Sequence, residues 1–332
     1  MADEDLTQDG TEKDDEPKRT FVEDINPGEM IEQPFLVQAK QLRTQRNGAF
    51  FLDLELADRT GVVPAKCWDA TTELFESFAE DDFILVRAQG ETYRRRLQLV
   101  VLDLKLIDPA EVDPADFLPA TKKDVDELAA RLSELVEGIE NPHLNALLTA
   151  FFEDEDFRSQ FSQAPAAVSI HHAWLGGLLE HTLAVAELAV ALAERYPNLN
   201  RDLLVAGAIL HDVGKIEQFD YSRSFRYTDA GGLLGHLPIG MRMVEQRAAE
   251  LEDFPPDLLD QLSHMILSHH GEYQYGSPVL PATAEAMALH YLDNLDAKLV
   301  AFDQALLRDQ NPQANWTDWN RIFERRLFKK RV

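Results

Sequence analysis

Histidine and aspartate side chains recur at wide intervals along the C-terminal two thirds of the chain, in segments that are otherwise apolar. An uncompensated imidazole or carboxylate buried there would cost on the order of several kcal/mol, and convergence of these groups on a metal ion would remove that cost. Imidazole and carboxylate ligands together suit Mn, Fe, Co, Ni or Zn. The set consists of His181, His211, Asp212, His236, His269, His270 and Asp293.

Two ions held by such a set would favour phosphate chemistry. A carboxylate shared between two ions can keep them about 3.5 to 4 Å apart, and both ions then draw charge from the phosphoryl oxygens during in-line displacement. The residue types therefore predict hydrolysis of a phosphate ester or diester. One alternative is a site with a single ion, in which His236, His269 and His270 recognise phosphate, because ligand type does not fix the number of ions.

The order of these residues, H, HD, H, HH and D, resembles the HD superfamily of phosphohydrolases, whose helical core carries this order in its two-metal members. The resemblance implies that Asp212 bridges two divalent ions and that Lys215, in His-Asp-Val-Gly-Lys, binds a substrate phosphate, so we expect both to be catalytic. Manganese is the ion that we expect, with iron, cobalt, nickel or zinc as alternatives. The resemblance assigns His181, His211 and Asp293 to the first ion, and His236, His269 and His270 to the second.

Polar and aromatic residues beside the ligands are candidates for substrate contacts. His171 and His172 precede a Gly-Gly turn and the helical segment with His181, so they could reach the mouth of the site. Tyr273 follows His270 in a loop, where an aromatic ring could stack on a terminal base. Capping or packing is the alternative for the two histidines, and loop packing is the alternative for the tyrosine.

Residues 20–108 have the alternation of a β-rich domain. Three strands are the simplest interpretation of residues 35–68, where FFLDLELADRTG alternates leucine with acidic residues. A short helix is expected at 70–79, and residues 82–108 indicate two strands around a turn near Gly90. Three strands, a helix and two strands are the order of a five-stranded OB-fold β-barrel.

OB barrels bind single strands by combining basic side chains with aromatic faces on which bases stack. Because side chains alternate across a strand, only some of the basic and aromatic residues here can share one face. The candidate strand contacts are Lys40, Arg43, Lys66, Trp68 and Arg94.

The pattern changes after the barrel. Pro and Asp punctuate a linker at 109–121, and Pro blocks continuation of a strand or helix. Residues 122–315 have helical periodicity, which predicts an all-α helical bundle. At the two ends, residues 1–19 form an acidic tail that we expect to be disordered, and residues 316–332 are expected to form a basic amphipathic helix.

Four longer stretches resemble the YhaM-type 3′-5′ exoribonucleases, which place an OB-fold ahead of an HD domain. They are IHHAWLGGLLEHT (170–182), GHLPIGMRM (235–243), LSHHGEYQYGSPVLPAT (267–283) and LHYLDNLDAKL (289–299). The resemblance covers residues 20–330 and implies metal-dependent, 3′-to-5′ release of nucleotides from single-stranded RNA, often also from single-stranded DNA, by a homo-oligomer. Two alternatives stay open: a phosphohydrolase acting on nucleotides or cyclic dinucleotides, and a non-catalytic RNA-binding or assembly module.

Composition limits the partners and the compartment. The net charge of -27 argues against bulk electrostatic coating of nucleic acid, which needs clustered Lys and Arg. Cys67 is the single cysteine, which excludes an internal disulfide and a Cys-rich zinc site and fits a reducing compartment. An acidic start and the lack of a long apolar run favour a cytoplasmic protein without a membrane segment.

Overall fold

The computed structural model describes residues 19–94, 96–168, 172–307, 309 and 314–330. Almost all of the expected acidic tail, and His171, lie outside these residues. The chain divides into two compact units between Phe117 and Leu118, a point that lies within the linker predicted at 109–121.

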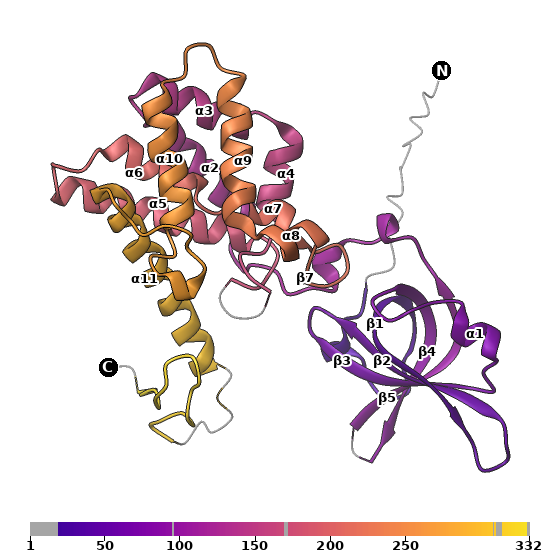
Figure 1. Ribbon diagram of the computed structural model, residues 1–332. Helices are drawn as coiled ribbons and strands as arrows, with labels where there is room; N and C mark the ends of the chain where they lie inside the picture. The colour runs from indigo at the N-terminus through magenta and orange to yellow at the C-terminus, as the bar shows by residue number, and fades with distance from the viewer. Residues whose placement is uncertain (1–18, 95, 169–171, 308, 310–313, 331–332) are drawn as a thin grey trace, which may run out of the picture. The chain divides into compact units, whose positions relative to one another are not determined.

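The first unit is a closed five-stranded barrel with the strand order β1-β2-β3-β5-β4 (Figure 1). The alternation in β2 buries every second side chain, so that Leu52, Leu54 and Leu56 lie in the barrel core. The order of three strands, a helix and two strands confirms the predicted OB-type barrel. The elements are β1 (Met30–Thr44), β2 (Phe50–Asp58), β3 (Gly61–Trp68), α1 (Thr72–Glu76), β4 (Phe83–Tyr93) and β5 (Arg96–Leu106), preceded by the 3₁₀ turn η1 (Val22–Asp24).

Gly90 does not make the turn that the sequence suggests. It lies inside β4, and the hairpin to β5 is made beyond Tyr93, where Arg94 has a φ of +49°. The amide of Gly90 donates to Glu29 O at 2.9 Å, and a Cβ at Gly90 would lie 2.6 Å from Asn26 O. Glycine is needed there because the chain before β1 approaches the strand closely.

The second unit is helical (Figure 1). Its apolar core takes residues from every helix from α2 to α11 except α8. An Asp or Asn side chain caps four of the helices by accepting from amides of the first turn. These caps are Asp124 for α2, Asn141 for α3, Asp154 for α4 and Asn200 for α6. The helices are α2 (Val125–Glu137), α3 (Pro142–Phe152), α4 (Glu155–Gln163), α5 (Gly177–Arg195), α6 (Arg201–Leu210), α7 (Lys215–Gln218), α8 (Asp229–Leu234), α9 (His236–Ala249), α10 (Pro256–Ser268) and α11 (Ala284–Leu307). Two short elements complete the second unit: β6 (Phe219–Asp220) pairs with β7 (Arg226–Tyr227), and the 3₁₀ turn η4 (Tyr273–Tyr275) follows α10. The 3₁₀ turns η2 (Pro109–Glu111) and η3 (Pro114–Asp116) lie at the end of the first unit. Across the part of the chain that is described, we find no helix that combines the length and apolar character required to span a membrane.

The basic C-terminal helix predicted at 316–332 is not formed. The described residues after α11 make a hairpin in which Trp316 pairs with Phe328 and Asn320 with Arg325. Asn320 Oδ1 accepts from the amides of Ile322 and Phe323 at 2.9 and 3.2 Å, which closes the turn. Side chains such as Asn compete in this way with the backbone bonds of a helix, so an amphipathic pattern did not decide the conformation.

Candidate metal centre

The predicted ligands come together where five helices of the second unit begin, end or pass. His181 lies in the second turn of α5, His211 and Asp212 follow α6, and His236 is the first residue of α9. His269 and His270 follow α10, and Asp293 lies in the middle of α11. α6 reaches this place because all residues from Leu203 to Leu210 are buried, so its C-terminal end lies deep in the core.

The two oxygens of Asp212 face different histidines. Oδ2 lies 3.2 Å from His211 Nε2 and 3.5 Å from His181 Nε2, whereas Oδ1 lies 3.4 Å from His236 Nε2 and 3.6 Å from His269 Nε2. Each carboxylate oxygen therefore has its own pair of imidazole nitrogens. A carboxylate in this position could be shared by two ions.

Asp293 and His270 each extend one of these two sides. Asp293 Oδ1 lies 3.2 Å from His181 Nε2 and 4.0 Å from His211 Nε2. The ring of His270 lies 5.0 Å from that of His236 and 4.6 Å from that of His269, and one ligand atom from each of these three residues lies within 4.8 Å of the others. The structure thus brings together all seven predicted ligands in two groups that share Asp212.

Backbone carbonyls orient three of the imidazoles. Nδ1 of His211, His269 and His270 lies 2.7 to 2.8 Å from the carbonyl oxygens of Ala208, Ile266 and Tyr275, respectively. A carbonyl can only accept, so each Nδ1 donates, and each Nε2 is left to face the site. This outer hydrogen bond is the arrangement by which proteins fix the tautomer of a metal-binding histidine.

A carboxylate orients the fourth imidazole. Asp296 Oδ2 accepts from His181 Nδ1 at 2.7 Å and from His172 Nε2 at 3.0 Å. The prediction that His172 reaches the substrate is therefore not supported, because its ring is only 2% exposed and is held inside by Asp296.

The protonation states match a cation site. Although burial alone would lower the pKa of His181, its hydrogen bonds to Asp293 and Asp296 raise that pKa to about 9. Burial lowers the pKa of His236 to about 3, so this imidazole is neutral. Burial would raise the pKa of Asp212, but Lys215 and His211 hold it well below the usual range. Asp212 is thus an anion beside a neutral imidazole, and a bound cation would replace the proton of His181.

Two buried atoms show that the residues fit such ions. Asp212 Oδ1 and His236 Nε2 have no hydrogen-bond partner among the described residues, although they lie 3.4 Å apart. Buried polar atoms left in this way cost free energy, and a cation between the side chains would recover it. The donor set, imidazole nitrogens and carboxylate oxygens, suits a divalent transition metal.

Lys215 contacts the centre directly. Its Nζ donates to Asp212 Oδ2 at 2.5 Å, and the residue is 8% exposed. The lysine lies in the first turn of α7, three residues after Asp212, so the turn between α6 and α7 positions both side chains. A buried ammonium in this place can bind an anionic substrate group beside the carboxylate.

Gly214 allows this turn to lie against α9. A Cβ at Gly214 would meet His236 O at 2.2 Å and Gly240 N at 2.5 Å, both of them backbone atoms. We expect Gly214→Ala to move the start of α9, to lower the free energy of unfolding by about 1 to 3 kcal/mol and to weaken manganese binding. Isothermal titration with manganese and thermal unfolding measure the two effects.

Gly232→Ala is the matched control, because no atom lies within 4 Å of a Cβ at Gly232 in α8. Alanine should be neutral or stabilising there by up to about 1 kcal/mol. Equal behaviour of the two variants would contradict the proposed role of Gly214.

A cavity of about 430 Å³ opens beside the ligands. The sequence did not single out five residues that line it, because their types carry no metal-binding signal: Asn294, Ala297, Lys298, Ala301 and Ile322. Tyr275 lines the cavity, whereas Tyr273, the predicted stacking residue, is 68% exposed and is not among the lining residues.

Known proteins resemble this chain both within its helical unit and along most of its length. The model of the HD domain family matches residues 178–298, a range that contains all seven predicted ligands. The 3′-5′ exoribonuclease YhaM of Geobacillus sp. (strain WCH70) is 34% identical over 306 residues, which are 92% of this chain and 93% of the relative. The chain belongs to the YhaM 3′-5′ exoribonuclease family. YhaM of Bacillus subtilis (strain 168) is 36% identical over 282 residues, 85% of this chain and 89% of that protein.

The barrel of this YhaM-family chain carries the other predicted contacts, and one of them is not available. Lys40 Nζ donates to Phe75 O at 2.6 Å and to Phe78 O, and it lies over both rings. It therefore holds the end of α1 against β1. The prediction that Lys40 contacts a nucleic-acid strand is not supported, because its ammonium already binds the protein.

Arg43, Lys66 and Trp68 share one outer face of β1, β2 and β3. In register, Arg43 stands opposite Phe51, and Phe51 stands opposite Trp68. Arg43 and Lys66 both lie near Asp53, at 3.0 and 3.9 Å, and Trp68 is 45% exposed. Arg94 lies apart at the β4–β5 turn, stacked on the ring of Tyr93.

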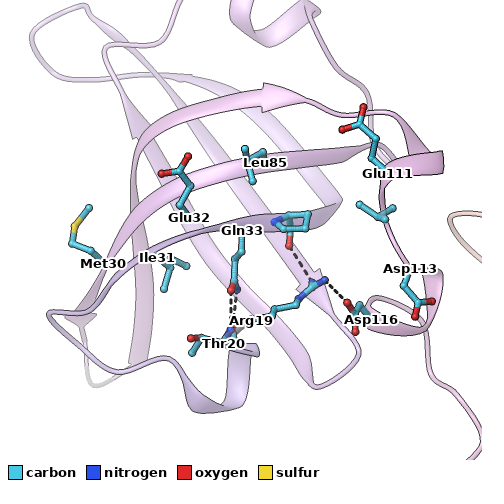
Figure 2. A pocket seen from close by; sticks show the side chains of 12 residues that line it. Arg19, Thr20, Met30, Ile31, Glu32, Gln33, Leu85, Glu111, Asp113 and Asp116 are labelled. Carbon is cyan, nitrogen blue, oxygen red and sulfur yellow. Dashed lines mark hydrogen bonds and ion pairs between the residues drawn. The ribbon is translucent and has the colours of Figure 1, made fainter. Parts of the chain in front are cut away.

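A groove of about 730 Å³ lies on another part of the barrel, along β1 (Figure 2). Its lining includes Glu32, Glu111 and Asp113, and its one lining guanidinium, Arg19, is bound by Asp116 at 2.9 Å and by Pro34 O at 3.1 Å. A phosphodiester backbone would meet mainly carboxylates there. The face with Arg43 and Trp68 is therefore the better candidate for a strand.

Proposed function

We propose that the protein is a divalent-metal-dependent 3′-5′ exoribonuclease. It would shorten single-stranded RNA from the 3′ end, accept single-stranded DNA as a second substrate, and release nucleoside 5′-monophosphates. The observation that carries the proposal is the buried carboxylate of Asp212, which faces two separate pairs of imidazole nitrogens in a chain that is similar along 92% of its length to a 3′-5′ exoribonuclease.

We propose two ions, with manganese as the preferred metal. Asp212 Oδ2 would belong to the first and Oδ1 to the second. The unpartnered Oδ1 atom and the separate histidine pairs support a shared carboxylate. The other ligands of the first ion would be His181, His211 and Asp293, and those of the second His236, His269 and His270.

The ions, when bound, supply Lewis-acid polarisation of the phosphodiester and lower the pKa of water. The residues of the chain place the substrate. Lys215 would release Asp212 and bind a non-bridging phosphate oxygen, since its ammonium already lies 2.5 Å from the shared carboxylate. Hydrogen bonds from Nδ1 keep His211, His269 and His270 from rotating while the substrate enters.

The barrel would hold the strand upstream of the cut. Trp68 offers an exposed ring, and a base stacked on it would contribute about 1 to 3 kcal/mol. Arg43 and Lys66 lie on the same face for the phosphates, and Arg94 would add a cation at the β4–β5 turn. We also propose a homo-oligomer and a cytoplasmic location; the second is supported by Cys67, a buried free thiol.

Hydrolysis of end-labelled RNA and DNA tests this function. We expect a 5′-labelled strand to shorten stepwise and a 3′-labelled strand to lose its label in the first step, as a nucleoside 5′-monophosphate. EDTA should stop the reaction, and a metal panel should restore it best with manganese. Shortening from the 5′ end, or turnover in EDTA, would overturn the proposal, and turnover of nucleotides alone would favour a small-molecule phosphohydrolase.

A further inference from the structure

The cavity beside the metal centre has two different sides. One consists of the site itself, with Asp212, Lys215 and Asp293 among its lining residues. The other is formed by one face of α11 and by Ile322 of the C-terminal hairpin. Its volume of about 430 Å³ lies within the range of roughly 300 to 1,000 Å³ that small-molecule sites have.

The α11 side combines small residues with unused polar groups. Asn294, Ala297, Lys298 and Ala301 follow one another at helical spacing on the face that lines the cavity. The two alanines leave space where larger side chains would fill it. The side chains of Asn294 and Lys298 form no hydrogen bond or ion pair with other described residues, so their donors are available to a ligand.

The hairpin holds an apolar side chain on the opposite side. Ile322 is 54% exposed although it is large and apolar. It sits in the turn that Asn320 closes, and the next residue, Phe323, packs edge-on against Phe302 of α11 at 5.5 Å between ring centroids. Leu327 is buried, at 3% exposed. The hairpin is therefore fixed against α11, and Ile322 stands as a wall of the cavity.

We propose that this cavity binds the 3′-terminal nucleoside of the substrate. This inference rests on the proposed function, because a cut at the metal centre leaves the terminal nucleoside attached to the phosphate that the centre holds. The base would lie between the alanines of α11 and Ile322, where apolar surface contacts its two faces. Asn294 and Lys298 would contact the sugar and its free 3′ hydroxyl.

The geometry gives the C-terminal hairpin a function in substrate binding. The basic segment at the chain end was expected to be a helix. Its role in the cavity is instead an apolar one, through Ile322, while Lys298 of α11 provides the cation on this side.

Binding of adenosine 5′-monophosphate and of ribose 5-phosphate, titrated with manganese present, tests the nucleoside site. Both probes carry the phosphate and the sugar, and only the first carries a base. We expect the wild-type protein to prefer adenosine 5′-monophosphate. Ala301→Leu should weaken its binding at least about tenfold, because the added isopropyl group occupies the space of the base, and should remove the preference over ribose 5-phosphate.

Ile322→Ala provides a second variant that does not depend on core packing, since Ile322 is exposed. It should reduce the same preference by several-fold. Leu299→Ala is the control on α11, because Leu299 is 60% exposed and does not line the cavity, and both affinities should stay as in the wild type. Equal binding of the two probes by the wild type, or an unchanged preference in Ile322→Ala, would overturn the inference. Because no RNA is cut in this assay, its outcome is independent of whether RNA is the substrate.

Discussion

Asp212→Asn should lower kcat/KM on single-stranded RNA by more than about 10³-fold. Loss of an outer-shell partner of a metal ligand already costs about 10- to 100-fold, and Asp212 is the carboxylate on which both histidine pairs converge. Asparagine keeps the shape of the side chain but removes the anion and one acceptor oxygen. Lys215, which pairs with Asp212, would then have no carboxylate at 2.5 Å to balance its charge.

The measurement is hydrolysis of labelled RNA at a fixed concentration of free manganese, with circular dichroism to show that the fold is kept. Asp220→Asn is the matched control, since Asp220 is also an aspartate of the second unit but pairs with Arg226 at 2.7 Å outside the centre. It should keep near-normal activity. Near-normal hydrolysis by Asp212→Asn under controlled metal would reject the site.

Asp296→Ala should weaken manganese binding by about 10- to 100-fold. Asp296 touches no proposed ion; it acts as a positioning residue, because its Oδ2 accepts from both His181 and His172. Without it, the imidazole of His181 can rotate or change tautomer, and His172 keeps a buried nitrogen without an acceptor. Each lost partner would also cost about 1 to 3 kcal/mol of stability.

Isothermal titration with manganese measures this effect directly, apart from activity. Asp296→Asn should fall between the wild type and Asp296→Ala, because an amide oxygen can still accept from one of the two histidines. Saturating manganese should recover most of kcat, since the proposed ligands remain. An unchanged manganese affinity in Asp296→Ala would show that Asp296 only supports the fold.

The grouping of the seven His and Asp side chains could be predicted from the sequence because its signal is chemical. His and Asp residues in apolar segments need partners, and their order along the chain matched a known family. The barrel could also be predicted, since the alternation around Leu52, Leu54 and Leu56 determines which side of β2 faces the core.

The errors concern residues whose partners lie far away in the sequence. Lys40 looked like a strand contact, but its acceptors are the carbonyls of Phe75 and Phe78, and only the closed barrel brings them near. His172 looked like a residue at the mouth, but Asp296, 124 positions later, holds it inside. No local pattern encodes such pairs.

The prediction of a C-terminal helix was wrong for a different reason. Its amphipathic pattern fits a helix, yet Asn320 and Glu324 favour a turn, the first by bonding the following amides and the second by adopting a φ of +49°. The turn then places Ile322 at the cavity beside the metal centre. A contact of this kind depends on the packing of Phe323 against α11, which the sequence does not reveal.

Anomalous diffraction from crystals grown with manganese would locate the ions at Asp212. We expect two manganese peaks, one beside Asp212 Oδ2 with His181, His211 and Asp293 around it, and one beside Oδ1 with the other three histidines. A single peak on either side would indicate that the site holds one ion. The proposed centre would be contradicted if an active enzyme bound manganese elsewhere while the carboxylate of Asp212 contacted only protein.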